Sequence, residues 1–140
     1  MICQILLKCN FLYKRKCNLI CIFFSLLVYF FNKAFLIKSL NGNIGIFCRS
    51  HLNDLFCPLF LLGIVNILFA WVDKEIKSYI GCISFVMASG CVWEFFSPLI
   101  NQKSVTDLWD LLAYFIGANI YFLLFSIEVK IKDNLVRTNN

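Results

Sequence analysis

The chain has 140 residues, of which 61% are hydrophobic and only 15% are charged. Ordinary soluble domains are about 45–50% apolar and about 25% charged, and a domain of this length cannot bury such an apolar excess. The composition therefore argues against a soluble globular protein and indicates one whose solvent is lipid. The net charge of +5 does not predict nucleic-acid binding, because the Lys and Arg residues flank the apolar segments.

The N-terminal segment, residues 1–16, is predicted to be cytoplasmic, with an apolar start that can lie on the membrane surface. The apolar run that follows is not a cleaved signal peptide, because it is long and lacks a small-x-small cleavage pattern. We interpret that run as a retained membrane anchor.

Four segments have about the 20 mostly apolar residues that a membrane-spanning helix needs. The fold is therefore predicted to be all-α, an integral membrane bundle of four transmembrane helices. The predicted helices cover about residues 17–37, 51–72, 79–97 (stopped by Pro98) and 107–127, and together they form one transmembrane domain, 17–127, followed by a cytoplasmic tail, 128–140. Residues 38–50, which include Cys48, are expected to form an outer loop.

Orientation is predicted from the basic residues, which tend to stay on the cytoplasmic side of a membrane. With both termini inside, nine of the thirteen Lys and Arg residues are cytoplasmic. This N-in/C-in arrangement places the start of the second helix, the end of the third and the start of the fourth at the outer face. The expected location is a cell membrane, specifically a bacterial plasma membrane.

The eight cysteines contain no CxxC pair and have no neighbouring histidine. Zinc and redox motifs are therefore not indicated. In apolar segments a free thiol behaves as a small hydrophobic group, so we expect thiols and no structural disulfide.

Acidic residues mark the outer ends of three predicted helices. Asp54, Glu94 and Asp110 each lie about 5 Å inside a helix end, given a rise of about 1.5 Å per residue. His51 and Asp107 precede two of them by three residues and so share their helix faces. We expect an outward-facing functional cluster of Glu94, Asp110, Asp54, Asp107, His51 and Tyr114, with Gly90, Tyr114, Gly117 and Asn66 as its floor.

Structural explanations compete with this functional interpretation. Asp107 fits a capping box that begins at Ser104, and acidic residues in a first helical turn favour the helix dipole. The same dipole effect would account for Asp54 and Asp110, and His51 would be a solvated residue at a helix start. The helix dipole does not explain Glu94, because an anion near a helix C-terminus is disfavoured; its structural alternative is an interfacial glutamate that reaches water.

The sequence resembles the C-terminal half of VanZ-like membrane proteins. The resemblance covers about residues 90–121 and rests on Glu94 near a helix end, a short polar loop, and Asp110 followed by Gly117-Ala118. Tyr114 and Lys103 depart from the family pattern, where Asn and Arg are usual. The resemblance implies a small multi-helix protein of bacterial membranes and a role in the cell envelope, with antibiotic resistance, as lower susceptibility to glycopeptides, among the expectations.

Three functions are compatible with these patterns. The first is a VanZ-like protein whose carboxylate pocket engages a lipid-linked envelope precursor or another headgroup. The second is a metal-dependent membrane enzyme or an ion or proton transporter subunit, with Glu94, Asp110 and Asp54 as oxygen ligands for magnesium, calcium or manganese. The third is a structural subunit that pairs with a partner helix. Membrane lipids and a second copy of the chain are the expected partners, and nucleic acid is not; no motif identifies a catalytic residue or a specific reaction.

Overall fold

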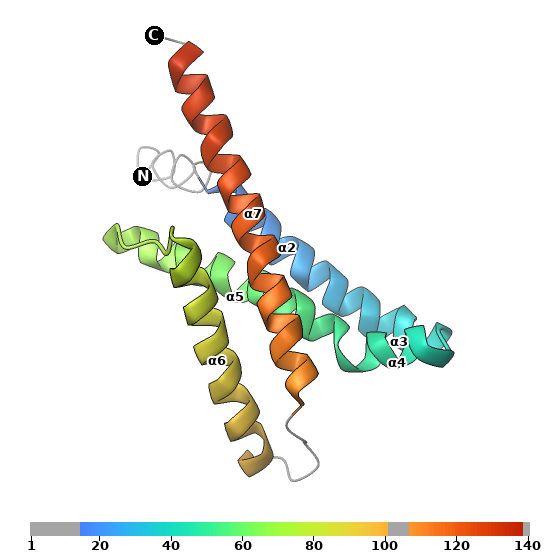
Figure 1. Cartoon of the computed structure of the whole chain (residues 1–140). Helices are drawn as coiled ribbons and strands as arrows, with labels where there is room; N and C mark the ends of the chain where they lie inside the picture. Colours follow the sequence, from blue (N-terminus) through green and yellow to red (C-terminus); the bar gives the residue numbers. More distant parts are fainter. Residues whose placement is uncertain (1–14, 101–106, 139–140) are drawn as a thin grey trace, which may run out of the picture.

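The structure is a computed structural model that describes residues 15–100 and 107–138 of the chain. Within these residues every regular element is helical, which confirms the all-α prediction (Figure 1). The elements are α2 (Lys16–Phe31), the π-helical turn η1 (Asn32–Leu36), α3 (Ile37–Ser39), α4 (Gly42–Ser50), α5 (Leu52–Phe69), the 3₁₀ turn η2 (Ala70–Val72), α6 (Tyr79–Ile100) and α7 (Leu108–Thr138).

Four helical stretches are long and apolar enough to cross a membrane, as the sequence predicts. They are Lys16–Ser39, Gly42–Val72, Tyr79–Phe96 and Leu108–Ile131. Their outer surfaces carry large apolar side chains that are exposed in the isolated chain, among them Phe23, Phe30, Ile80 and Leu123. An apolar surface of this extent indicates contact with lipid, so the chain is a multi-pass membrane protein.

The prediction of a loop at residues 38–50 is wrong, because residues 42–50 form the helix α4. α4 is held against the first span by Asn32, a fully buried residue whose side-chain amide donates hydrogen bonds to the Cys48 carbonyl (2.8 Å) and to Oδ1 of Asn53 (3.1 Å). Cys48 is consequently buried instead of lying in an exposed loop. His51 forms the bend between α4 and α5, with φ −120° and ψ −15°.

Two other helix ends differ from the predicted bounds. α6 continues to Ile100, beyond the expected stop at Pro98; a proline removes one backbone hydrogen bond but has a φ that a last helical turn accepts. α7 continues to Thr138 through the segment expected to be a cytoplasmic tail, and Figure 1 shows it extending past the other helices. Most of the N-terminal segment, residues 1–14, lies outside the described residues.

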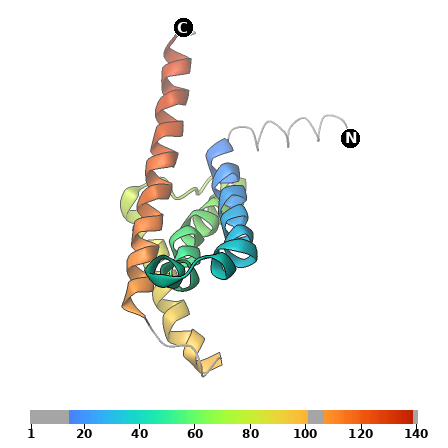
Figure 2. The ribbon, with the colours of Figure 1, turned by 90° about the vertical axis from the view of Figure 1, so that its right-hand side faces the viewer.

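The helices pack in the order α2 on α5, α5 on α7 and α7 on α6 (Figures 1 and 2). Two glycines allow the close approaches. A Cβ at Gly63 would lie 2.8 Å from Cγ1 of Ile22, and a Cβ at Gly117 would overlap the Leu55 carbonyl oxygen. Small residues at such contacts are typical of membrane helices. In lipid the hydrophobic effect does not drive helices together, so association depends on close van der Waals packing of their backbones.

A buried hydrogen-bond network joins three helices to the loop of residues 73–78. Tyr121 donates its hydroxyl proton to Oδ1 of Asn18 and accepts a bond from the Asn66 amide, both at 2.7 Å. Asn66 also bonds the backbone N–H (2.6 Å) and carbonyl (3.1 Å) of Ile76. The expectation that Asn66 lines the functional pocket is therefore wrong, because its side chain is occupied in fixing this loop.

The same end of the molecule carries an ion-pair cluster. Glu75 contacts Nε of Arg15 at 2.6 Å and Nζ of Lys77 at 3.1 Å, which ties the start of α2 to the 73–78 loop. Glu128 on α7 accepts a bond from the Cys17 backbone N–H at 3.2 Å. The start of α2 and the C-terminal part of α7 therefore lie at one end of the bundle.

The six cysteines within the described residues are free thiols. Cys17 and Cys21 lie one helical turn apart on α2, with their sulfur atoms 3.9 Å from each other.

Candidate functional site

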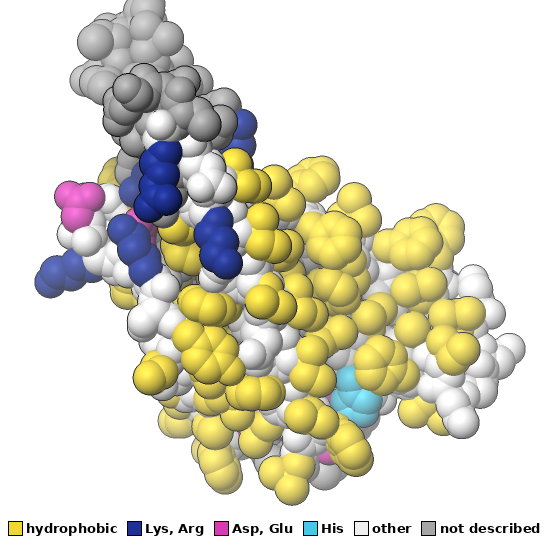
Figure 3. Space-filling view, turned by 45° about the horizontal axis from the view of Figure 1, so that its top comes forward, with side chains coloured by type: hydrophobic (Ala, Val, Ile, Leu, Met, Phe, Trp, Pro, Cys, Tyr) yellow, Lys and Arg dark blue, Asp and Glu magenta, His cyan; other side chains and the backbone are white. Residues whose placement is uncertain are grey.

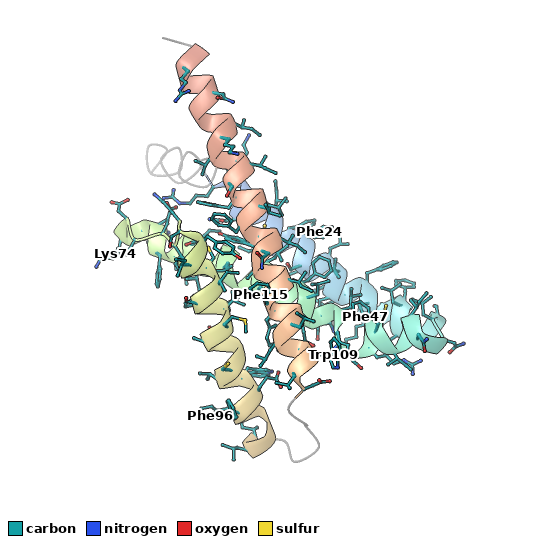
Figure 4. The ribbon with its side chains drawn as sticks, viewed as in Figure 1. Phe24, Phe47, Lys74, Phe96, Trp109 and Phe115 are labelled. Carbon is teal, nitrogen blue, oxygen red and sulfur yellow. The ribbon has the colours of Figure 1, made fainter. Side chains whose placement is uncertain are left out.

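The six predicted site residues meet at the end of the bundle opposite the Glu75 cluster. They come from the α4–α5 bend, α5, α6 and the start of α7, so no single helix provides the site. Figure 4 shows the region near Trp109, where the start of α7 approaches α5, while Lys74 marks the opposite end. On the face shown in Figure 3, Lys and Arg side chains gather at one end and the histidine lies toward the other, surrounded by apolar side chains.

His51 and Asp110 form the partly exposed part of the site. Nδ1 of His51 lies 2.7 Å from Oδ1 of Asp110, and their side chains are 21% and 19% exposed. Because a carboxylate can only accept, the imidazole N–H is the donor. The bend at His51 makes this contact, since it turns the imidazole away from α5 toward the first turn of α7.

Asp107 lies just before α7 and caps it. Its Oδ1 accepts the backbone N–H of Trp109 at 2.9 Å, the usual contact of an aspartate at an N-cap. The expected capping box began instead at Ser104, a residue outside the described part of the chain. Asp107 thus has a structural role, which supports the helix-cap interpretation for this one carboxylate.

Tyr114 joins the two carboxyl groups on the neighbouring helices. Its hydroxyl lies 3.3 Å from Oδ1 of Asp54 on α5 and 3.3 Å from Oε1 of Glu94 on α6. Tyr114 and Glu94 are only 5% and 6% exposed. Gly90 leaves room for the ring, because a Cβ there would lie 2.6 Å from Cδ2 of Tyr114.

Glu94 connects this buried part of the site to the partly exposed part. Its Oε2 lies 3.5 Å from the Asp107 backbone N–H, which donates to it. Asp54 is also within electrostatic range of Asp110, Glu94 and His51. The six side chains therefore form one continuous cluster, although Gly117 and Asn66, expected in its floor, do not belong to it.

The Tyr114 hydroxyl cannot serve Asp54 and Glu94 equally. A hydroxyl carries one proton and can donate to one carboxylate at a time. Two carboxylates in contact with one hydroxyl, within a membrane-spanning helix bundle, repel each other and are disfavoured by desolvation. A cationic group with several N–H donors could donate hydrogen bonds to both acids at once and offset their repulsion.

A metal ion would find different ligands from those predicted. Among the described residues, the group with suitable geometry is His51, Asp107 and Asp110, whose ligand atoms lie within 4.8 Å of one another. Of the predicted ligands Glu94, Asp110 and Asp54, only Asp110 belongs to it. One imidazole and two carboxylates suit manganese or zinc better than magnesium or calcium, yet Asp107 already caps α7 and His51 already bonds Asp110.

A cavity of about 590 Å³ adjoins the half-buried Asp54. Asp54 and Tyr114 form part of its wall, and the rest is mostly apolar side chains of α2, α5 and α6. Sequence reasoning did not predict this cavity. The available signal was Ser25, a polar residue inside the apolar run from Leu19 to Phe31, which lines it.

No known protein family, curated protein or solved structure matches this chain.

Proposed function

We propose that this membrane protein binds the amine-bearing headgroup of a membrane amphiphile at the six-residue cluster, through Asp54, Glu94, Asp110 and Tyr114. The observation that carries the proposal is the position of the Tyr114 hydroxyl between Asp54 and Glu94, at the wall of a cavity. An ammonium group has three N–H donors and a positive charge, so it can donate to both carboxylates at once, whereas the Tyr114 hydroxyl donates to one at a time.

The charge of the cluster supports a cationic ligand. It contains four carboxyl groups, and His51 is the one basic side chain among its six members. A bare phosphate headgroup would be repelled by this arrangement. Amines, or sugar hydroxyls that can donate hydrogen bonds, are the headgroup chemistry that the cluster favours.

Both termini are cytoplasmic in this proposal, and the cluster faces the outside of a bacterial plasma membrane. The predominance of Lys and Arg on the predicted inner side supports the orientation. The resemblance to VanZ-like proteins, carried by Glu94, Asp110 and Gly117-Ala118, supports a ligand of the cell envelope, such as a lipid-linked precursor. Lower glycopeptide susceptibility on expression would be the expected cellular effect.

Binding of an amine in lipid nanodiscs tests the proposal. We expect the parent protein to bind butylamine, a short amine without a membrane anchor, in a saturable manner that native mass spectrometry or thermal shift can record. Glu94→Gln and Asp54→Asn should each weaken binding about tenfold or more, because a buried charge-assisted hydrogen bond is lost. Asp73→Asn is the matched control, since Asp73 is an exposed acid at the other end of the molecule.

Equal binding by the parent protein and both site variants would refute the proposed function. A second candidate, a metal-dependent activity, is favoured by the proximity of His51, Asp107 and Asp110. Adding a chelator during the butylamine titration distinguishes direct amine binding from metal-dependent binding. Amine binding that persists in a chelator supports direct recognition by carboxylates, whereas binding that disappears, and returns with manganese, supports a metal bridge.

A further inference from the structure

The cavity beside the cluster is far larger than an amine headgroup requires. At about 590 Å³ it falls in the size range of sites for drug-sized ligands, about 300–1,000 Å³. Leu26 of α2, Phe60 and Leu61 of α5, and Val86 of α6 give it an apolar wall. A ligand that filled this space would need a substantial hydrocarbon part.

Two helices form opposite sides of the cavity without being a packed pair. α2 packs on α5, and α6 packs on α7. The space between α2 and α6 is thus bounded by α5 and by Tyr114 of α7. Because this space lies between membrane-spanning helices and its wall is mostly apolar, a hydrocarbon chain is compatible with it.

Ser25 supplies an independent indication of a ligand. The residue is only 5% exposed, and its hydroxyl is buried and has no hydrogen-bond partner among the described residues. It also lines the cavity. A buried polar group without a partner is costly, and a hydroxyl placed at a cavity wall is explained by a polar atom of a bound molecule.

We propose that the cavity binds the hydrocarbon chain of a long-chain primary amine whose ammonium group lies at Asp54 and Glu94. This inference rests on the proposed function and specifies its ligand class. Asp54 and Tyr114 belong to both the cluster and the cavity wall, so one molecule can occupy both with a continuous chain. The ammonium group is the only polar group of such a ligand, and one of its three N–H groups can donate to the Ser25 hydroxyl.

Hexadecylamine and butylamine, compared in nanodiscs, separate recognition of the chain from recognition of the amine. Ser89→Leu narrows the cavity from α6 without changing a carboxylate, and Ser84→Leu is its matched control, because Ser84 is exposed on the same helix and does not line the cavity. We expect Ser89→Leu to weaken hexadecylamine binding at least tenfold and to leave butylamine binding unchanged. Ser84→Leu should affect neither amine.

Ser25→Ala provides a second test that does not change the shape of the cavity wall. It should weaken hexadecylamine binding several-fold without lowering the melting temperature of the ligand-free protein, because the hydroxyl has no partner there. Equal effects of Ser89→Leu and Ser84→Leu on hexadecylamine, or equal losses of hexadecylamine and butylamine in Ser89→Leu, would overturn the chain-binding inference without contradicting the proposed function. If Glu94→Gln and Asp54→Asn bind both amines as tightly as the parent protein does, the proposed function itself is wrong.

Discussion

At the scale of single residues, the acids of this chain fall into two groups with different surroundings. Glu75 is paired with Arg15 and Lys77, so its charge is balanced within the protein. Burial alone would raise the pKa of Glu75, but the hydrogen bonds from Lys77 and Arg15 outweigh it and hold that pKa below its usual value. Asp54 lies close to two other acids, Glu94 and Asp110, and contacts the same tyrosine hydroxyl as Glu94, which is why we propose a function for Asp54 and Glu94 and a structural role for Glu75.

The stabilising role of Glu75 depends on pH. Glu75→Gln should lower the free energy of unfolding near pH 7 by about 1 kcal/mol, the upper end for partly exposed ion pairs. Because the pKa is lowered in the folded protein, this stabilisation is present above the unfolded pKa of about 4.5 and is lost as the pH falls through the lower folded value. The melting temperatures of the parent and the variant should therefore begin to approach each other near pH 4.5 and become equal only below the lower folded pKa.

Asp73→Asn controls for the removal of one negative charge from the same loop, and it should leave the melting curve unchanged. A difference between parent and Glu75→Gln that stays constant from pH 7 to pH 3 would show that the ion pairs do not stabilise the fold.

At the scale of helices, the apolar runs predict the four spans because lipid imposes a length and a composition on each one. α4 could not be predicted in the same way. Gly42, Asn43 and Gly45 are weak helix formers, and the segment is helical because Asn32 and the residues around Leu40 hold it in place. The proximity of acidic residues from α5, α6 and α7 could be predicted from the sequence, whereas the bend at His51 and the cap at Asp107 depend on this tertiary packing.

The approach of α5 to α7 sets the distance between Asp54 and Tyr114. A Cβ at Gly117 would overlap the Leu55 carbonyl oxygen and lie 2.9 Å from Cγ of Pro58. Gly117→Ala should therefore force the two helices apart, lower the melting temperature and weaken amine binding, although it removes no polar group. Since overpacking typically costs about 1–3 kcal/mol, the loss of stability should be measurable by thermal unfolding in nanodiscs.

Ala118→Gly is the control variant for Gly117→Ala. It changes the neighbouring residue of α7, but it removes a methyl group instead of adding one. Loss of stability without loss of amine binding in Gly117→Ala would show that the spacing of α5 and α7 does not position the site.

At the scale of the whole molecule, polar groups are concentrated at the two ends of an apolar bundle. The Asn18, Asn66 and Tyr121 network and the Glu75 ion pairs close the end that carries the start of α2. The carboxylate cluster lies at the opposite end and adjoins a cavity between α2 and α6. This separation suits a protein that is rigid at one end and accepts a membrane ligand at the other.

Magic-angle-spinning NMR measures the central contact directly. The sample would be the full chain in nanodiscs, with ¹³C-labelled Asp and Glu, and hexadecylamine labelled with ¹⁵N at the amine. We expect dipolar transfer from the amine nitrogen to one Asp and one Glu carboxyl carbon, with the Glu signal lost in Glu94→Gln and the Asp signal lost in Asp54→Asn. Transfer that is absent in the parent protein, or that is unchanged in both variants, would contradict the account.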